Sequence, residues 1–135
     1  MSHFRAKRKR GGGWVEGALL TLLPDDPKIV YLTASKQVSS TSVQEHTIGQ
    51  YIDLTDKNGK MAFVGDIFKD SGGVVHTIFT TKGGFATESH PMAFGYGSQR
   101  GSNPTIALSD SQAAAWFMDS CEIIGNIYDN LDLLQ

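Results

Sequence analysis

Residues 47–60 read TIGQYIDLTDKNGK, and this stretch decides the fold class. Apolar and polar side chains alternate through residues 47–54, as they do in a strand with one buried face. The Asn58-Gly59 dipeptide that follows is a strong hairpin signal, because both residues accept left-handed backbone dihedrals. Residues 61–64 (MAFV) resume the apolar pattern after the turn. The stretch therefore predicts a β-hairpin.

Short apolar segments separated by glycine-rich or polar turns extend outward from this hairpin on both sides. They are residues 4–8, 14–23, 28–33, 65–69, 74–81, 85–86, 105–108 and 121–128. A strand and a turn that repeat about every 8–12 residues are typical of small sandwiches and barrels. The pattern predicts a mostly β fold, either a strongly bent antiparallel sheet or a partial barrel. Residues 35–45 are interpreted as a polar loop or an exposed strand.

One short helix is expected near the C-terminus. Ser109 and Gln112 have the spacing of a capping box, and residues 113–118 (AAAWFM) continue as a helix. Residues 88–104 have no period and are interpreted as a long surface loop. Residues 130–134 are expected to form one closing helical turn.

Composition bounds the classes of protein that remain. The chain has 135 residues, of which 19% are charged, so it is too apolar for a disordered polyelectrolyte and fits a single domain over residues 1–135. The single cysteine, Cys121, excludes an intramolecular disulfide, a Cys-rich zinc site and a CxxC redox centre. No cofactor is expected.

Positive charge is concentrated at the start of the chain. The first ten residues carry five basic side chains and no acid, whereas the rest carries seven basic residues against 14 acidic ones. One interpretation is an edge strand whose charges prevent aggregation. The other is an interaction surface that binds nucleic acid or an acidic protein. The candidate residues for that surface are Arg5, Arg8, Arg10, Tyr96 and Arg100.

The N-terminal segment superficially resembles a signal peptide. Residues 18–23 (ALLTLL) follow the basic start, but Glu16 and three glycines intervene and no cleavage site follows. The run is also shorter than the roughly 18 residues that span a bilayer. It is interpreted as a buried strand, and the protein is expected to be cytoplasmic, with no membrane partner.

Three blocks of sequence resemble the YopX family of phage and prophage proteins. They are residues 4–17 (FRAK and then WVEG), residues 48–67 and the tail at residues 121–134. The resemblance implies a mostly β domain encoded by a mobile element and often seen as repeated chains, so residues 1–135 are expected to form a single YopX-like domain. It implies no catalytic residues. The tail departs from the family pattern where Leu131 follows Asn130, because a proline usually stands there.

The physical properties of several residues within these blocks predict structural roles for them. Gly49 and Gly65 flank the hairpin around Gly59, and each permits a bulge or a close backbone approach. Asp66 is expected to accept backbone N–H groups at the start of a strand. Gly125 interrupts an apolar strand, and Asn126 is expected to tie backbone segments together there.

Catalytic and metal-binding signals are weak. The four histidines have no metal-ligand spacing, and no serine lies on a GxSxG-type turn. His76 shares a strand face with Val74 and Ile78, so it is interpreted as a hydrogen-bonded histidine at the edge of the core. His90 is placed in the surface loop. No catalytic, cofactor-binding or metal-binding residue is therefore assigned.

The favoured hypothesis is a non-enzymatic phage or prophage accessory protein that acts by binding another macromolecule. An unidentified protein partner is expected, and a homo-oligomer is plausible because hairpin edges need covering. The first alternative is a weak nucleic-acid-binding module that uses the basic N-terminal hairpin. The second is an uncharacterised small enzyme that uses His76, His90 or Asp66.

Overall fold

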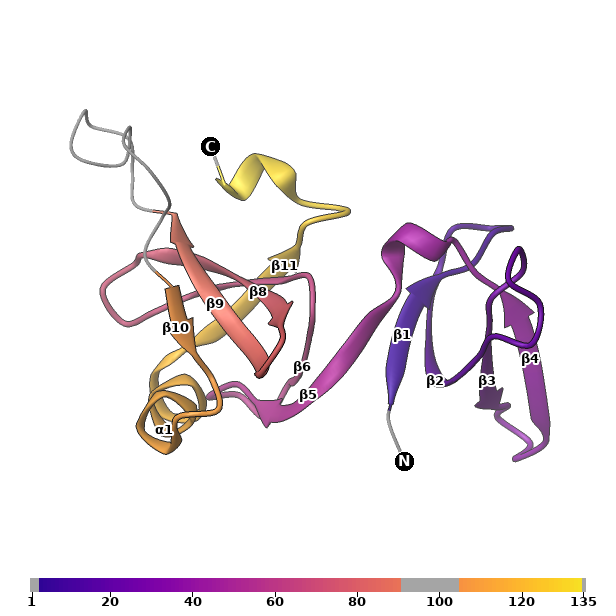
Figure 1. Ribbon diagram of the computed structural model, residues 1–135, viewed down its shortest axis with the longest axis horizontal. Coiled ribbons are helices and arrows are strands. Elements are labelled where there is room, and N and C mark those ends of the chain that lie inside the picture. The colour runs from indigo at the N-terminus through magenta and orange to yellow at the C-terminus, as the bar shows by residue number, and fades with distance from the viewer. Residues whose placement is uncertain (1–2, 91–104, 135) are drawn as a thin grey trace. The chain divides into compact units, whose positions relative to one another are not determined.

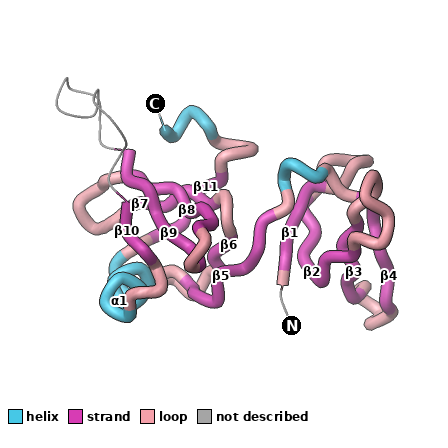
Figure 2. Tube along the Cα trace, viewed as in Figure 1, coloured by secondary structure: helices cyan, strands magenta, loops and turns pink. Residues whose placement is uncertain are grey.

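The computed structural model describes residues 3–90 and 105–134, and these residues are mostly β-strand (Figures 1 and 2). They form eleven strands in two antiparallel sheets, one α-helix and two short 3₁₀ helices, η1 and η2. The prediction of a mostly β chain with one short helix near its C-terminus is confirmed. Among the described strands, neither sheet closes into a barrel.

The chain divides into two compact units. The N-terminal unit is Met1–Tyr51 and the C-terminal unit is Ile52–Gln135, and strand β5 (Gly49–Thr55) contains the boundary. Each unit has its own cluster of buried apolar side chains. That residues 1–135 act as a single YopX-like domain stays a prediction.

The N-terminal unit is a bent sheet of four antiparallel strands in the order β4-β3-β2-β1. The strands are β1 (Phe4–Lys7), β2 (Trp14–Leu20), β3 (Lys28–Leu32) and β4 (Val38–Ser42), and the start of β5 pairs with β1. After β4 the backbone turns back to the end of β1. The Lys9 N–H donates to the Ser42 carbonyl over 3.0 Å, and the Gln44 N–H donates to the Lys7 carbonyl over 2.8 Å. A bent sheet is consistent with the fold class that the sequence predicts.

One face of this sheet encloses the N-terminal core. Ala6, Val15, Ile29 and Val43 are buried there, and further apolar side chains pack against them. Gly17 permits the strands to approach this closely, because a Cβ at that position would lie 2.0 Å from the Val30 carbonyl oxygen. The helix η1 (Glu45–Thr47) follows, and the Thr47 hydroxyl accepts the Lys7 N–H over 2.9 Å.

The C-terminal unit contains a five-stranded sheet in the order β10-β9-β8-β7-β11. The strands are β7 (Asp66–Lys69), β8 (Val75–Thr81), β9 (Gly84–His90), β10 (Thr105–Ala107) and β11 (Glu122–Asn126). Strand β6 (Met61–Phe63) pairs with β5. Helix α1 (Ser111–Ser120) contributes the buried Phe117, which packs at 4.9 Å, edge to face, against Phe68 of β7.

Asp56 joins the hairpin at residues 56–60 to the last strand of this unit. Its Oδ1 accepts the N–H groups of Asn58 and Lys60, each over 2.9 Å, and its Oδ2 accepts the Ile123 N–H over 2.8 Å. The carboxylate is buried, and each of its oxygens is hydrogen-bonded, as a buried charge requires. The middle block and the tail block of the sequence therefore meet at this residue.

Four expectations about element ends are wrong. Strand β2 ends at Leu20, because the backbone leaves the sheet before the proline-bounded turn, so Leu22 and Leu23 are exposed rather than buried. Asp110, not Ser109, caps α1 by accepting the Gln112 N–H. Strand β9 continues to His90 through pairing with β8, although residues 87–90 lack an apolar pattern.

The fourth concerns the tail, where β11 ends at Asn126 instead of continuing to residue 128. Its last residue turns the chain: Asn126 Oδ1 accepts the N–H groups of Tyr128 and Asp129, each over 2.9 Å. The expected closing helical turn is present as η2 (Leu131–Leu134).

Candidate functional site

The basic N-terminal hairpin distributes its side chains over two faces. Arg5 and Lys7 lie on the same side of β1 and both stack on Trp14, with their charged groups 4.9 and 5.6 Å from the ring centroid. Arg8 lies on the other side, donates to the Trp14 carbonyl over 3.2 Å and covers the Tyr31 ring at 5.5 Å. Arg10 is exposed in the turn. The candidate arginines therefore do not form one continuous basic surface.

Tyr96 and Arg100 were predicted to join this surface. Both lie outside the described residues, as does most of the predicted loop at residues 88–104.

A basic hollow of about 570 Å³ lies at one end of β4. Lys9, Arg10 and Lys28 line it together with residues 40–42. Asp26 is its one acidic group and lies 3.9 Å from Lys9 Nζ and 3.6 Å from Lys28 Nζ. A hydrogen bond from Ser42, together with these two lysines, lowers the pKa of Asp26. The hollow thus combines three cations with one carboxylate.

The side of β2–β4 that faces away from the core is unusually apolar. We call it the outer face, and it is formed by Ala18, Leu20, Lys28, Val30, Leu32, Val38, Ser40 and Ser42. Leu32 and Val38 are 67% and 74% exposed and lie opposite each other on neighbouring strands. With Val30 they line an apolar hollow of about 340 Å³. The solvated face of an antiparallel sheet normally carries polar side chains at such positions.

A second apolar hollow extends this surface toward the turn after β2. Leu20, Leu22 and Leu23 line it, its volume is about 320 Å³, and it shares Asp26, Lys28 and Ser40 with the basic hollow. Leu22 and Leu23 are 81% and 61% exposed. The outer face is not among the surfaces predicted from the sequence. The sequence carries only part of the signal: residues 29–32 are apolar on both sides of the strand, and this does not show which side faces the core.

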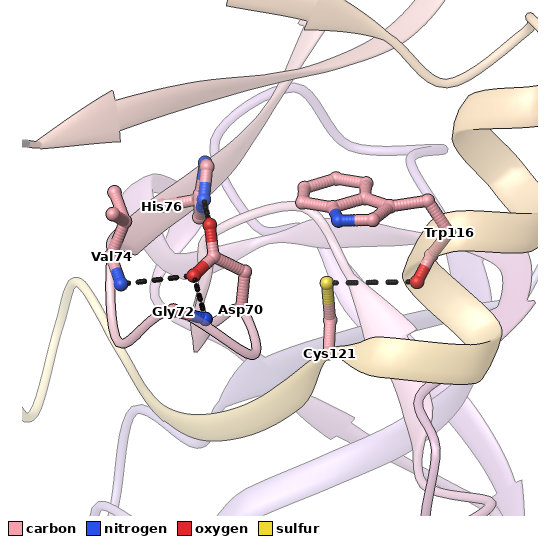
Figure 3. Close-up of polar contacts among 6 residues, drawn as sticks. All are labelled: Asp70, Gly72, Val74, His76, Trp116 and Cys121. Atoms are coloured by element: carbon pink, nitrogen blue, oxygen red, sulfur yellow. Dashed lines mark hydrogen bonds and ion pairs between the residues drawn. The ribbon is translucent and has the colours of Figure 1, made fainter.

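The C-terminal unit contains a pair formed by the partly buried Asp70 and the buried His76 (Figure 3). Asp70 Oδ1 accepts the N–H groups of Gly72 and Val74 over 2.9 and 3.0 Å, and Asp70 Oδ2 lies 3.0 Å from His76 Nε2. Partial burial raises the pKa of Asp70, but the hydrogen bonds from His76, Val74 and Gly72 outweigh this and lower it.

His76 is enclosed by aromatic rings. It stacks on Phe68 with centroids 4.8 Å apart and meets Trp116 edge to face at 5.4 Å, so the side chain is only 5% exposed. Its Nδ1 is buried without a hydrogen-bond partner among the described residues. This is the core-edge histidine that the sequence analysis expected, held by a partner, Asp70, that it did not identify.

Cys121 lies near this pair (Figure 3). Its thiol is buried and is 3.8 Å from the Trp116 carbonyl oxygen. Burial raises the pKa of Cys121 to about 12, so the thiolate is scarce at neutral pH. The side chain behaves as a small apolar group with a weak donor, not as an activated nucleophile.

The other candidate titratable residues have local partners. His90 lies at the end of β9, not in the predicted loop, and its Nε2 is 3.1 Å from the Thr77 hydroxyl and 3.5 Å from Glu88. Asp66 is buried and accepts the Phe63 N–H over 2.8 Å. These two groups and His76 are each engaged with their own neighbours.

The glycines that the motifs single out differ in their environments. Gly59 and Gly65 have φ angles of +81° and +95°, and a Cβ on Gly65 would lie 3.1 Å from the Tyr128 ring. Gly125 lies at a register shift between β11 and β7, where a Cβ would be 2.5 Å from Asn130 Oδ1. Gly49 is buried opposite Arg5 of β1.

Neither a candidate metal-binding cluster nor a candidate membrane-spanning helix is present within residues 3–90 and 105–134. No group of three or more His, Cys, Asp or Glu side chains is arranged to hold a metal ion. In the same part of the chain, no helix is both long and apolar enough to cross a membrane.

The fold resembles that of a solved structure, and the sequence matches a family model. The crystal structure of protein EF1440 from Enterococcus faecalis resembles the chain with a TM-score of 0.56 and 19% sequence identity. The likeness covers 100% of this chain and 99% of that one, and at this identity it shows a shared fold. No curated protein matches. The family model described as YopX protein matches residues 3–135. Since that match takes in nearly the whole sequence, the chain belongs to the YopX family, as the three motif blocks predict.

Proposed function

We propose that the protein is a non-enzymatic, cytoplasmic accessory protein of a phage or prophage that binds another protein through the outer face of its N-terminal unit. The observation that carries the proposal is the exposure of Leu32 and Val38 at 67% and 74%, side by side above an apolar hollow. An exposed apolar patch that is surrounded by polar residues usually marks an interaction site. Membership of the YopX family supports a phage or prophage context.

The contacts of the titratable groups favour binding over catalysis. A general acid or base must come within hydrogen-bond reach of its substrate. His76 is enclosed between Phe68 and Trp116, and Cys121 is buried with a raised pKa. By contrast, the outer face is open.

A site-specific photo-crosslinker tests the proposal. We would place a benzophenone amino acid at position 32 on the outer face and, as a matched control, at position 131, where Leu131 is 59% exposed in the C-terminal unit. In a lysate of cells that express the protein, the expected result is a discrete protein adduct from position 32 that position 131 does not give. Adding Val38→Asp should remove the adduct without changing the thermal unfolding of the protein.

The adducts also separate the classes of partner. A protease-sensitive adduct that Val38→Asp removes supports the proposal. A nuclease-sensitive adduct, or the same adducts from positions 32 and 131, contradicts it.

Weak nucleic-acid binding is the second candidate function. The basic hollow favours it, because Lys9, Arg10 and Lys28 are gathered there. Three observations limit it: Arg5 and Lys7 stack on Trp14, Arg8 is bonded to the Trp14 carbonyl, and Asp26 is placed between two of the lysines.

A further inference from the structure

Strand β4 is the edge strand of the N-terminal sheet, and some of its backbone N–H and C=O groups point away from its neighbour β3. The Val43 N–H donates inward to Pro27, whereas the Ser42 carbonyl accepts from Lys9 on the opposite side. Backbone groups alternate along a strand, so those of Val38 and Ser40 also point away from β3. No described residue pairs with these outward N–H and C=O groups. The edge is therefore open at two residues.

The two ends of this open edge differ in chemistry. The apolar hollow with Val30 and Leu32 lies at the Val38 end. At the Ser42 end lies the basic hollow, where three cations outnumber the carboxylate of Asp26. Val38 and Ser42 are four residues apart on the same face, which corresponds to about 13 Å along a strand.

We propose that β4 binds an extended segment of a partner protein as an added strand. Backbone hydrogen bonds to Val38 and Ser40 hold the segment, an apolar side chain occupies the hollow at Leu32, and an acidic side chain four residues away in the segment pairs with Lys9, Arg10 or Lys28. Adding a strand to a sheet edge is a general mode of peptide recognition in which side-chain pockets supply specificity. The inference rests on the proposed function and names the kind of partner.

Charge decides against a second copy of this chain at the same edge. The N-terminal unit has seven basic residues against four acidic ones, a net charge of +3. Pairing β4 with β4 of another copy would bring two such units together and leave both basic hollows without an acidic partner. An acidic segment meets the same edge with complementary charge.

A synthetic peptide, Ac-TLTVTDT-NH₂, provides the probe, because its leucine and aspartate are four residues apart. With saturating peptide, amide hydrogen exchange measured by NMR should slow by about 10-fold or more at Val38 and Ser40, which gain strand partners. Exchange at Ser39 and Thr41, whose backbone groups already face β3, should stay unchanged. A control peptide with lysine in place of the aspartate should bind about 10-fold more weakly or worse.

Two variants at one position test the backbone contact. Ser40→Pro removes the outward N–H without removing a hydrogen bond to β3, so binding of the peptide should fall by about 10-fold or more. Ser40→Ala keeps the backbone group and should bind like the wild type. If Ser40→Pro does not fold, a peptide N-methylated at alternate amides makes the same test on the wild-type protein.

Several results would overturn the inference. Equal binding by Ser40→Pro and wild type, or equal binding of the lysine and aspartate peptides, contradicts strand addition or the acidic preference. A dimer in light scattering that Ser40→Pro abolishes shows a second copy at the edge, and duplex DNA that protects the same two amides shows nucleic acid there. If the peptides fail while the position-32 adduct persists, only strand addition fails. If the adduct is also absent, the proposed function fails with it.

Discussion

Asp70 is the residue on which the turn between β7 and β8 depends. Its carboxylate accepts N–H groups from Gly72, Val74 and His76. Replacing it with asparagine removes the charge and leaves His76 Nε2 buried with a weaker acceptor. We expect Asp70→Asn to lower the free energy of unfolding by about 1–3 kcal/mol at pH 7. Urea denaturation measures this, and an unchanged midpoint would contradict the role.

The same residue predicts a dependence on pH. The pKa of Asp70 is lowered in the folded protein relative to 3.8, the ordinary value, so folding favours its charged form. Its contribution is fully present above the unfolded pKa and is lost as the pH falls through the folded pKa. The difference in unfolding free energy between wild type and Asp70→Asn should therefore be constant from pH 7 to about 5 and shrink below pH 4. A difference that grows toward acid contradicts the assignment.

Gly59 tests the hairpin that the sequence predicts most directly. Its φ is +81°, and no atom lies within 4 Å of where a Cβ would be, so a larger side chain meets strain but no clash. Gly59→Val should lower the free energy of unfolding by about 1–2 kcal/mol. Gly83→Val is the matched control, because Gly83 has equally open space and its φ lies outside the left-handed region. Equal thermal unfolding temperatures for the two variants would rule out strain at Gly59.

Among elements, the tail shows why a trailing segment is part of the fold. Strand β11 forms one edge of the C-terminal sheet, buries Ile123 in the core and supplies the N–H that Asp56 accepts. Truncation after Ser120 removes all three, and the product should be unfolded or insoluble. Truncation after Asn130 removes η2, whose side chains are not buried, and should leave a folded protein. Circular dichroism and size-exclusion chromatography compare the two, and a folded product from the shorter chain would contradict the prediction.

Strands and helices could be predicted where the local sequence pattern agrees with the strand pairing in the structure. The strands around Gly59 combine alternation with a turn residue that requires positive φ, and both follow from residues close in sequence. The sequence pattern ends strand β9 at residue 86, four residues before its actual end at His90, because its last residues are held by register with β8 rather than by their own side chains. The N-cap of α1 is Asp110 rather than Ser109. Either of these adjacent residues can cap a helix, and which one does so depends on where the preceding segment ends.

At the scale of the whole molecule, the sequence indicated the family and the fold class, whereas the candidate interaction surface that includes Arg5, Arg8 and Arg10 stays a prediction. The basic residues were visible in the composition, yet strand alternation separates Arg5 from Arg8. The outer face could not be assigned from the sequence, because residues 29–32 are apolar on both sides of their strand. Only its neighbours show that Ile29 faces the core while Leu32 faces solvent. The sequence alone cannot supply that assignment, since it depends on the register with β2 and β4.

The two units carry net charges of opposite sign, and this limits the affinity that we expect for nucleic acid. The N-terminal unit carries a net +3, whereas the C-terminal unit has five basic residues against ten acidic ones, a net −5. Arg5 and Lys7 stack on Trp14, and Asp26 lies beside Lys9 and Lys28, so few cations are directed at one surface. We therefore expect only weak, non-specific binding to DNA, with a Kd no tighter than about 10⁻⁶ M at physiological salt.

A salt titration of binding to duplex and single-stranded DNA measures that affinity. Its comparison variant changes Arg8, Lys9 and Arg10 to serine, and the matched control changes Lys57, Lys60 and Lys69 of the C-terminal unit to serine, which removes the same charge elsewhere. Weak binding that falls with salt should be reduced to a similar extent by both triple variants, because a diffuse charge is all that holds the DNA. Sub-micromolar binding with a steep salt dependence, abolished only by the hairpin variant, would instead make the basic hairpin the functional surface of the protein.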